Sequence, residues 1–209
     1  MNVTLYAANG RIGSRILTEL LSRGHQVKAV VRDVSKVAPA PGLTIEQGNM
    51  DSASGIAEKA KGSDAIISAH GAKPDNPKES IEVMKRLVDA IKQSGAKRLM
   101  VVGGASSLEV APGKQLFDEP TFPPEWKAGA DAHREAKKVL MASDINWTYL
   151  SPAMMITPGE RTGKFRLGKD SLVTDAEGKS QISMEDYAVA MVDELETPKH
   201  ERMRFTLAY

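Results

Sequence analysis

The feature that most constrains the fold of this chain is a regular alternation of short apolar runs and longer amphipathic segments. The apolar runs predict strands over Val3–Ala7, Gln26–Val31, Leu43–Glu46, Asp64–Ala69 and Arg98–Val102. Apolar residues spaced three and four apart predict helices between them, over Arg11–Arg23, Ser52–Lys61 and Glu79–Ser94. Strand–helix–strand units of this kind join parallel strands through right-handed crossovers. We therefore expect an α/β fold, a doubly wound parallel sheet with helices on both faces.

The second half of the chain continues the alternation less regularly. A loop is expected over 103–123, which is rich in Gly, Pro and Ser, and an irregular segment over 152–180. The remaining elements are predicted to be a helix from Pro124 to Ala142, a strand over Trp147–Leu150, a last helix capped by Ser183 and an edge strand over Arg204–Leu207. With 209 residues, the chain is long enough for one sizeable core, so we expect a single domain over 1–209.

The composition excludes several classes of function. The 28 basic and 27 acidic side chains nearly balance, so no basic surplus points to nucleic acid or to a membrane surface. The lack of cysteine excludes disulfides, thiolate metal sites and cysteine nucleophiles. No signal-peptide pattern or membrane-spanning apolar run occurs in the sequence. We expect a cytoplasmic monomer or homodimer without a metal, acting on a small molecule and not on nucleic acid or membrane.

The turn A-A-N-G-R-I-G at 7–13 joins the first predicted strand to the first predicted helix. In a doubly wound sheet this turn lies at the carboxyl edge, near the point where the strand order reverses. The helix begins there with unpaired N–H groups and a partial positive charge, which suits a phosphate. Gly10 would let the backbone approach a pyrophosphate, and Gly13 would let the helix pack close to the strand. Arg11 could lie across the phosphates or the adenine.

This turn therefore predicts a dinucleotide site. Its expected members are Ala8, Asn9, Gly10, Arg11, Ile12 and Gly13. Ala7 stands where the fingerprint has its first glycine, and we expect it to narrow the turn slightly. The alternative is that Gly10 only forms a turn and Gly13 only packs, but the strand before and the helix after favour nucleotide binding.

The second predicted strand ends in V-V-R-D-V-S-K. An acidic residue at this place usually binds the ribose 2′-hydroxyl of NAD, whereas an arginine accommodates the 2′-phosphate of NADP. Arg32 and Lys36, four residues apart, could hold that phosphate together, which favours NADP(H) over NAD(H). Asp33 keeps NAD(H) open, and the two cations could also be solvated surface charges.

Further cofactor-binding residues are expected where the third, fourth and fifth strands end. They are Asn49, Met50, Ala69, His70, Gly71 and Gly103. The residues after the third strand could meet the adenine edge, and the small residues after the fourth would let the ribose and nicotinamide pass. His70 could be a hydrogen-bonding wall or an incidental loop histidine.

Five segments together resemble a known family. They are A-A-N-G-R-I-G-S-R-I at 7–16, V-V-G-G-A-S-S-L-E-V-A-P-G at 101–113, W-T-Y-L-S-P-A at 147–153, P-G-E-R-T-G-K-F-R-L-G at 158–168 and I-S-M-E-D-Y-A-V-A at 182–190. The chain is similar to the atypical short-chain dehydrogenase/reductases provisionally named NADH-flavin reductases, near relatives of the NmrA-like proteins and the biliverdin-IXβ/flavin reductases. The resemblance implies one Rossmann-like domain that binds a nicotinamide dinucleotide at the glycine turn and transfers hydride to a flavin. Ala7 and Ser106 depart from glycines that are common in the family.

Candidate catalytic residues lie in the second half. The chain lacks the Tyr-x-x-x-Lys pair that moves a proton in the wider superfamily, which argues against carbonyl reduction. The nearest pattern is His133 followed by Lys137, which would share one helix face, although the polar surroundings favour a solvent-facing helix of mixed charge. Ser106 and Ser107, after the fifth strand, could hydrogen-bond a substrate carbonyl or a flavin edge, or could only form a tight turn. Ser107 is preferred because the family pattern includes it.

Flavin reduction requires little side-chain chemistry, because the protein mainly holds two rings at the right separation and excludes water. The loops 103–123 and 152–180 would supply the wall that faces the flavin. Candidate wall residues, each of which could instead be simple packing, are Phe117, Phe122, Trp126, Met154 and Met155.

The predicted function is therefore an NAD(P)H-dependent reductase of free flavins (FMN or FAD) or of quinone-like acceptors. A non-catalytic NAD(P) sensor of NmrA type is the first alternative, since no firm acid–base set is present. A nucleotide-sugar epimerase or dehydratase is the second, and it would need the missing tyrosine.

Overall fold

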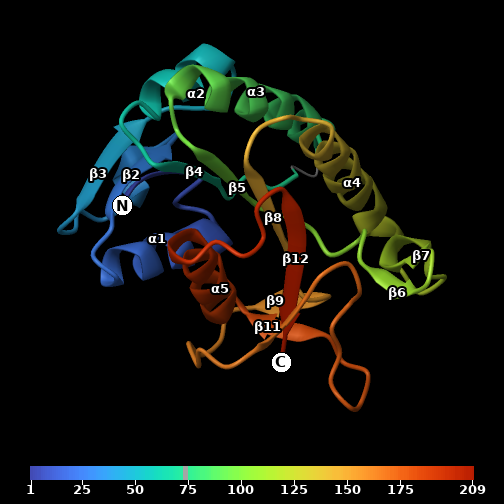
Figure 1. Ribbon diagram of the computed structural model, residues 1–209. Helices are drawn as coiled ribbons and strands as arrows, with labels where there is room; N and C mark the ends of the chain where they lie inside the picture. The colour runs from blue at the N-terminus through green and yellow to red at the C-terminus, as the bar shows by residue number, and fades with distance from the viewer. Residues whose placement is uncertain (73–74) are drawn as a thin grey trace.

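The central element is an eight-stranded sheet with the strand order β10-β12-β8-β5-β4-β1-β2-β3 (Figure 1). This computed structural model describes residues 1–72 and 75–209. The strands are β1 (Asn2–Tyr6), β2 (Gln26–Val31), β3 (Leu43–Gln47), β4 (Ala65–Ser68), β5 (Arg98–Val102), β8 (Trp147–Ser151), β10 (Arg166–Gly168) and β12 (Met203–Ala208). Neighbouring strands pair in parallel, except that β10 runs antiparallel to β12.

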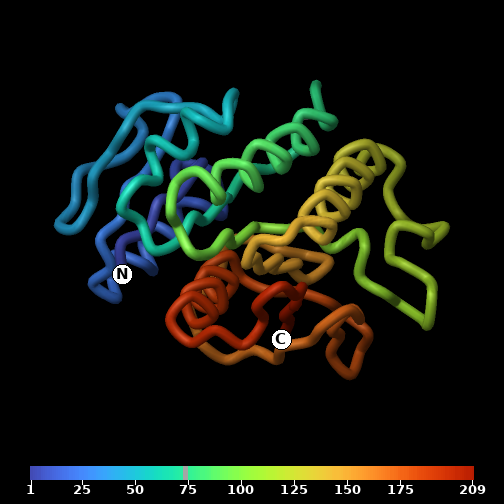
Figure 2. The backbone as a smooth tube through the Cα atoms, turned by 45° about the horizontal axis from the view of Figure 1, so that its top comes forward, coloured from blue at the N-terminus to red at the C-terminus, as the bar shows by residue number. Residues whose placement is uncertain are grey.

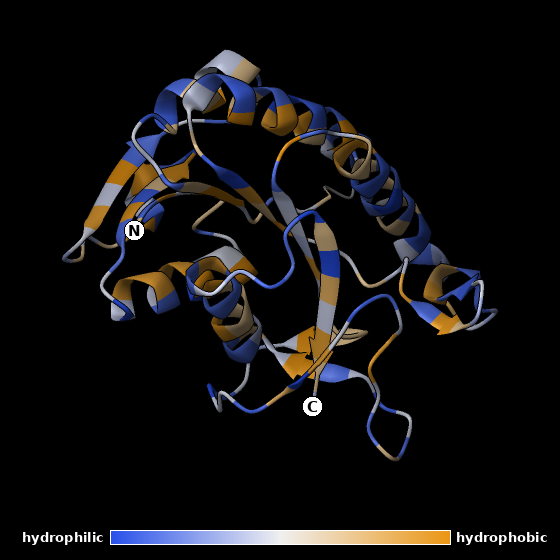
Figure 3. Ribbon diagram, in the orientation of Figure 1, coloured by the Kyte–Doolittle hydropathy of each residue, from blue (hydrophilic) through white to orange (hydrophobic). Residues whose placement is uncertain are grey.

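Helices cover both faces of the sheet. One face carries α1 (Arg11–Ser22) and α5 (Met184–Glu196), and the other carries α2 (Ala53–Lys59), α3 (Glu79–Ser94) and α4 (Lys127–Met141). Figure 2 shows α3 and α4 side by side on one face, with the red α5 on the opposite side. Bands of hydrophobic and hydrophilic residues alternate along these helices, as amphipathic packing against a sheet requires (Figure 3).

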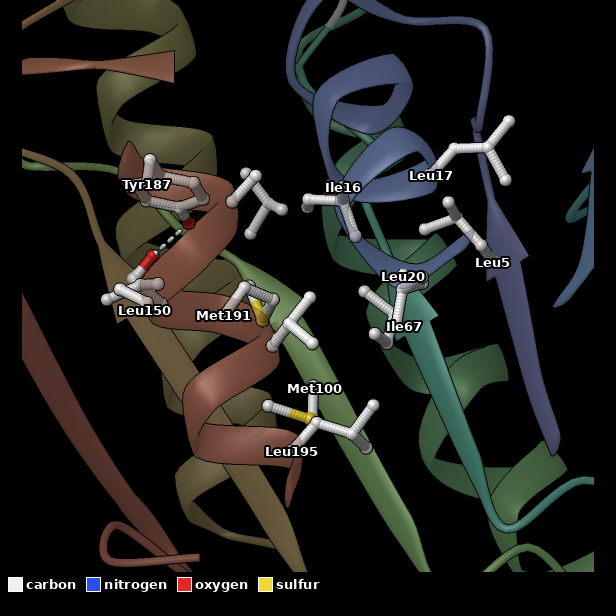
Figure 4. Packing of buried hydrophobic residues seen from close by; sticks show 14 of the residues in the cluster. Leu5, Ile16, Leu17, Leu20, Ile67, Met100, Leu150, Tyr187, Met191 and Leu195 are labelled. Atoms are coloured by element: carbon white, nitrogen blue, oxygen red, sulfur yellow. Dashed lines mark hydrogen bonds between the residues drawn. The ribbon is translucent and has the colours of Figure 1, made fainter. Parts of the chain in front are cut away.

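The sheet separates two hydrophobic cores. The core under α1 and α5 includes Leu5, Ile16 and Met191 (Figure 4). In this core the buried hydroxyl of Tyr187 donates a hydrogen bond to the carbonyl oxygen of Leu150 at 2.7 Å, drawn as a dashed line in Figure 4. The core under α2, α3 and α4 is mostly aliphatic and includes Tyr6 and Tyr149. The expected doubly wound fold is confirmed.

Three expectations about the second half are corrected. The strand over Arg204–Leu207 is not an edge strand, because β12 lies between β8 and the short edge strand β10. The expected loop 103–123 contains a hairpin of β6 (Glu109–Ala111) and β7 (Lys114–Gln115). The expected irregular segment 152–180 contains β10 and also β9 (Met155–Thr157), which pairs with β11 (Gln181–Ser183). These strands have two or three residues each, too few for an alternating pattern to show.

The strand order reverses between β1 and β4. The chain passes from β1 outward to β2 and β3, and then returns to place β4, β5 and β8 on the other side of β1. The connections after β1 and β4 therefore leave in opposite directions and open a crevice at the carboxyl ends of these strands.

Among the helices of the described residues, none combines the length and the hydrophobicity that a membrane-spanning helix needs.

Candidate functional site

The turn between β1 and α1 presents an open helix N-terminus. Gly10 is the N-cap residue, and within the described part of the chain no side chain caps the helix and no acidic residue lies in its first turn. A Cβ atom on Gly13 would lie 2.2 Å from the carbonyl oxygen of Ala7, so only glycine allows the helix to press this closely on the turn. Uncapped N–H groups at such a place are suited to bind an anionic group.

Ala7 itself adopts an unusual backbone conformation. Its φ of 57° lies in the left-handed region, where a Cβ atom is disfavoured and glycine is the usual residue. The sequence predicts that Ala7 narrows the turn slightly; the structure shows that this alanine takes a left-handed backbone conformation.

A first cavity, of about 480 Å³, lies along this turn and the carboxyl ends of β1, β2, β4 and β5. The predicted cofactor residues that line it are Asn9, Gly10, Arg11, Ile12, Arg32, Asn49, Met50, Ala69, His70, Gly71 and Gly103. Ala8, Gly13 and Lys36 are not in its lining. Ala8 and Gly13 are buried beneath the turn, and Lys36 is exposed on the surface.

The three charged residues after β2 have different surroundings: Arg32 lines the first cavity, whereas Asp33 and Lys36 form an ion pair with each other. The carboxylate of Asp33 accepts hydrogen bonds from the backbone N–H (3.1 Å) and the hydroxyl (2.6 Å) of Ser35. Those two bonds, and then the charge of Lys36 with its Nζ 3.7 Å away, lower the pKa of Asp33. Asp33 is thus occupied in a local turn, whereas Arg32 is available to a ligand.

Several residues that the sequence analysis did not assign to cofactor binding also line the first cavity. They are Tyr6, Ala7, Val30, Val31, Gly48, Asp51, Glu79, Val83, Val102, His133, Ile156 and Met184. Most of them belong to the ends of β1 to β5, where the doubly wound pattern could have placed them. Ile156 and Met184 come from the distant strand β9 and helix α5, and no local sequence signal points to them. His133 was assigned to catalysis and not to the cofactor.

A second cavity, of about 390 Å³, adjoins the first, and His133 and Ile156 line both. Three of the predicted wall residues, Phe122, Trp126 and Met154, line this second cavity. Phe117 and Met155 are not in its lining. The rings of Phe122 and Trp126 meet edge to face with centroids 6.4 Å apart. The second cavity is therefore a mostly apolar space next to the end of the first.

His133 occupies the junction of the two cavities. Burial, and then the nearby His70, lowers the pKa of His133 below its usual value of 6.5. Its imidazole is thus neutral at pH 7 and offers one hydrogen-bond donor and one acceptor. Lys137, one turn further along α4, lines neither cavity. Burial, and then the charge of Arg204, lowers the pKa of Lys137 to about 8.

The two candidate serines occupy different surroundings. Ser106 lines the second cavity, and its hydroxyl donates to the carbonyl oxygen of Ala130 at 3.2 Å. Ser107 is buried outside both cavities, where its carbonyl and hydroxyl oxygens accept from Arg204 at 2.8 and 3.0 Å. The structure therefore brings Ser106 and His133 together at the second cavity. Ser107 instead contacts Arg204 of β12.

Tyr149 contacts the loop that follows β5. Its hydroxyl accepts a hydrogen bond from the N–H of Gly104 at 3.0 Å, and burial raises its pKa to about 12. A Cβ atom on Gly103 would lie 2.2 Å from its ring. Tyr149 therefore supports the backbone of the loop after β5, and its hydroxyl is turned to that backbone.

Comparison with known proteins gives a family and a close relative. The chain matches the family described as NAD(P)H-binding over residues 7–198. A Bacillus subtilis protein, called uncharacterized protein YwnB, is 41% identical over 211 residues, which cover 99% of this chain and 98% of that protein.

Solved structures share the fold along the whole chain. One from Burkholderia pseudomallei, with the provisional name of an exported protein, is 44% identical with a TM-score of 0.91 and covers 100% of both chains. One from Bacteroides thetaiotaomicron, provisionally named an epimerase, is 40% identical with a TM-score of 0.93 and covers 100% of this chain and 96% of the other. One from Streptococcus pneumoniae, provisionally named an NADH-flavin reductase, is 34% identical with a TM-score of 0.90 and covers 100% and 99%.

Proposed function

Because this chain belongs to the NAD(P)H-binding family, we propose that it is an oxidoreductase that passes hydride from NADPH to a planar acceptor, either a free flavin or a quinone. The observation that carries this proposal is the pair of adjoining cavities. The first follows the open N-terminus of α1, and the second is mostly apolar and meets the first at His133 and Ile156. Two sites that share a wall can hold a dinucleotide and an acceptor ring next to each other.

The residues of the first cavity fit NADPH. The N–H groups at the start of α1 would bind the pyrophosphate, with Gly13 allowing the close approach of the helix. Arg32 would bind the 2′-phosphate, since Asp33 is occupied by Ser35. This division of roles supports NADP(H) over NAD(H). When bound, the dinucleotide supplies the hydride.

The second cavity would bind the acceptor ring and shield it from water. Its apolar walls exclude water, which keeps the reacting rings in contact and prevents side reactions. The neutral imidazole of His133 can donate a hydrogen bond to a carbonyl oxygen or ring nitrogen of the acceptor. Such a bond stabilises negative charge that develops on that atom as hydride arrives. Little further side-chain chemistry is needed.

A dinucleotide sensor is the second candidate function. The observation that favours it is that no tyrosine–lysine pair lines either cavity within residues 1–72 and 75–209. The same observation disfavours an epimerase, which would need a catalytic tyrosine beside the nicotinamide. Tyr149 does not supply one, because its hydroxyl is buried against the N–H of Gly104.

One experiment separates these functions. The purified protein would be mixed with NADPH or NADH and with riboflavin, FMN or menadione, and nicotinamide absorbance would be followed over time. Turnover well above the uncatalysed rate with at least one acceptor is expected. Cofactor binding by calorimetry without turnover on any acceptor would exclude the reductase and support the sensor.

A further inference from the structure

The walls of the second cavity are small or apolar. The small residues are Ala72, Gly104, Ala105, Ser106, Ala128, Gly129, Ala130 and Ala153, and the larger ones are Leu116, Phe122, Pro123, Trp126, Pro152, Met154 and Ile156. Trp126 and Met154 are 47% and 42% exposed, so they lie at the mouth of the cavity. A cavity of this size and character suits a flat aromatic molecule.

The described lining of this cavity carries negative charge and no positive charge. Among the described lining residues, the carboxylate of Glu125 is the one full charge at pH 7, because His133 is neutral. Glu125 is exposed and makes no ion pair with any described residue. Because Glu125 is exposed and also lines the cavity, its negative charge lies on the solvent side of the cavity.

Two cations of α4, Lys127 and Arg134, contact the ring of Phe117. The Nζ atom of Lys127 lies 5.8 Å from the ring centroid of Phe117, and the guanidinium carbon of Arg134 lies 4.4 Å from it. These cation–π contacts engage both cations, and neither Lys127 nor Arg134 is in the lining of the second cavity. The described residues of this wall therefore offer an anionic ligand no cation and one repelling carboxylate.

We propose that the acceptor is an uncharged planar aromatic molecule, a quinone or a flavin without a phosphate, and that Glu125 disfavours acceptors with an anionic group. This inference rests on the proposed reductase function. In the reaction the acceptor gains a hydride from the nicotinamide and a proton from solvent, NADPH is oxidised to NADP⁺, and the dihydro form of the acceptor leaves. Glu125 is a specificity residue that acts through its charge.

Riboflavin and FMN provide a matched test, because they differ only by the phosphate. We expect the wild-type kcat/KM with NADPH to be several-fold higher for riboflavin than for FMN. Glu125→Lys should raise the FMN-to-riboflavin ratio by about tenfold at low salt, and less at high salt. Glu125→Gln should give an intermediate ratio. Glu135→Lys makes the same change of charge on α4 outside both cavities and should leave the ratio near the wild-type value.

The outcomes are distinguishable. A wild-type preference for FMN, or a ratio that moves equally in the Glu125→Lys and Glu135→Lys proteins, would overturn this inference and leave the reductase function standing. No turnover with riboflavin, FMN or menadione, in a protein that binds NADPH, would overturn the reductase function and the inference with it.

Discussion

Arg32 and Asp33 are neighbours in the chain, yet their side chains have different surroundings. Arg32 lines the first cavity, whereas Asp33 binds Ser35 and Lys36. Arg32→Glu should therefore weaken NADPH binding at least about tenfold, since a hydrogen bond to a charged group contributes about 1.5–3 kcal/mol. NADH binding should change little. Calorimetric titration of both coenzymes measures the ratio of the two affinities.

Lys36→Glu is the matched control for this prediction. It makes the same reversal of charge four residues away, at a side chain that does not line the cavity. We expect a change of less than about threefold in the NADPH-to-NADH affinity ratio, because exposed charges are screened. If Lys36→Glu proves as harmful as Arg32→Glu, the two cations hold the phosphate together, as the sequence pattern alone suggested.

Two substitutions in the glycine turn should change the free energy of unfolding in opposite directions. Gly13→Ala places a methyl group 2.2 Å from the carbonyl oxygen of Ala7, so we expect about 1–3 kcal/mol of lost stability and a large loss of NADPH affinity. Ala7→Gly removes a Cβ atom from a residue with a φ of 57° and should be neutral or stabilising by up to about 1 kcal/mol. Urea unfolding measures both. Equal losses in the two variants would show that the turn rearranges freely.

At the scale of elements, α5 holds the segment 158–165 by its first turn. The carboxylate of Asp186, fully buried, accepts the backbone N–H of Thr162 (2.8 Å) and of Gly163 (2.7 Å). It also accepts the hydroxyls of Thr162 and Tyr209, at 2.5 and 2.9 Å. The P-G-E-R-T-G-K-F-R-L-G segment that carries the family resemblance thus has a structural role here, as a loop that a buried carboxylate fixes.

Asp186→Asn should release this loop. An amide accepts fewer of the four hydrogen bonds, and we expect a loss of about 2–4 kcal/mol in the free energy of unfolding. Trypsin should then cut faster after Arg161 and Lys164. Glu160→Gln is the control in the same loop, with an exposed side chain and an expected effect within about 0.5 kcal/mol. Unchanged proteolysis in Asp186→Asn would mean that the loop is held by other contacts.

Elements long enough to show a regular hydrophobic pattern could be predicted from the sequence, whereas strands of two or three residues could not. The observed bounds of β2, β5 and α3 are those that the apolar spacing predicted, and Ser183 caps α5 through the N–H of Asp186. The glycine turn, too, follows from local pattern and lies on the first cavity. The position of Ser107 under Arg204, in contrast, is set by a strand 97 residues away, which no local pattern reports.

At the scale of the whole molecule, charged networks join the two ends of the chain. The buried carboxylate of Glu19 in α1 accepts hydrogen bonds from Arg161, at 2.7 and 2.8 Å, and from Arg23. Arg23 in turn bonds to Asp193 and Glu196 of α5. The bonds from Arg161, with those from Arg23, outweigh burial and lower the pKa of Glu19 below its usual 4.5.

This network predicts acid sensitivity. Because the folded pKa of Glu19 is lowered, its stabilisation is fully present above pH 4.5 and is lost as the pH falls through the folded value. Glu19→Gln should cost about 1–3 kcal/mol at pH 7, and this difference from wild type should shrink below pH 4. Urea unfolding at several pH values tests it, with the exposed Glu58→Gln as control. A difference that is independent of pH would contradict the assignment.

The place of β12 in the sheet has a consequence for synthesis on the ribosome. β10 is made before β12, yet its place in the sheet exists only after β12 has docked on β8. The flank of β8 is therefore an open strand edge while the intervening residues are being translated, and other nascent chains can pair with it. Slow translation of this stretch should favour aggregation over folding, and chaperones that cover strand edges should matter most at this moment.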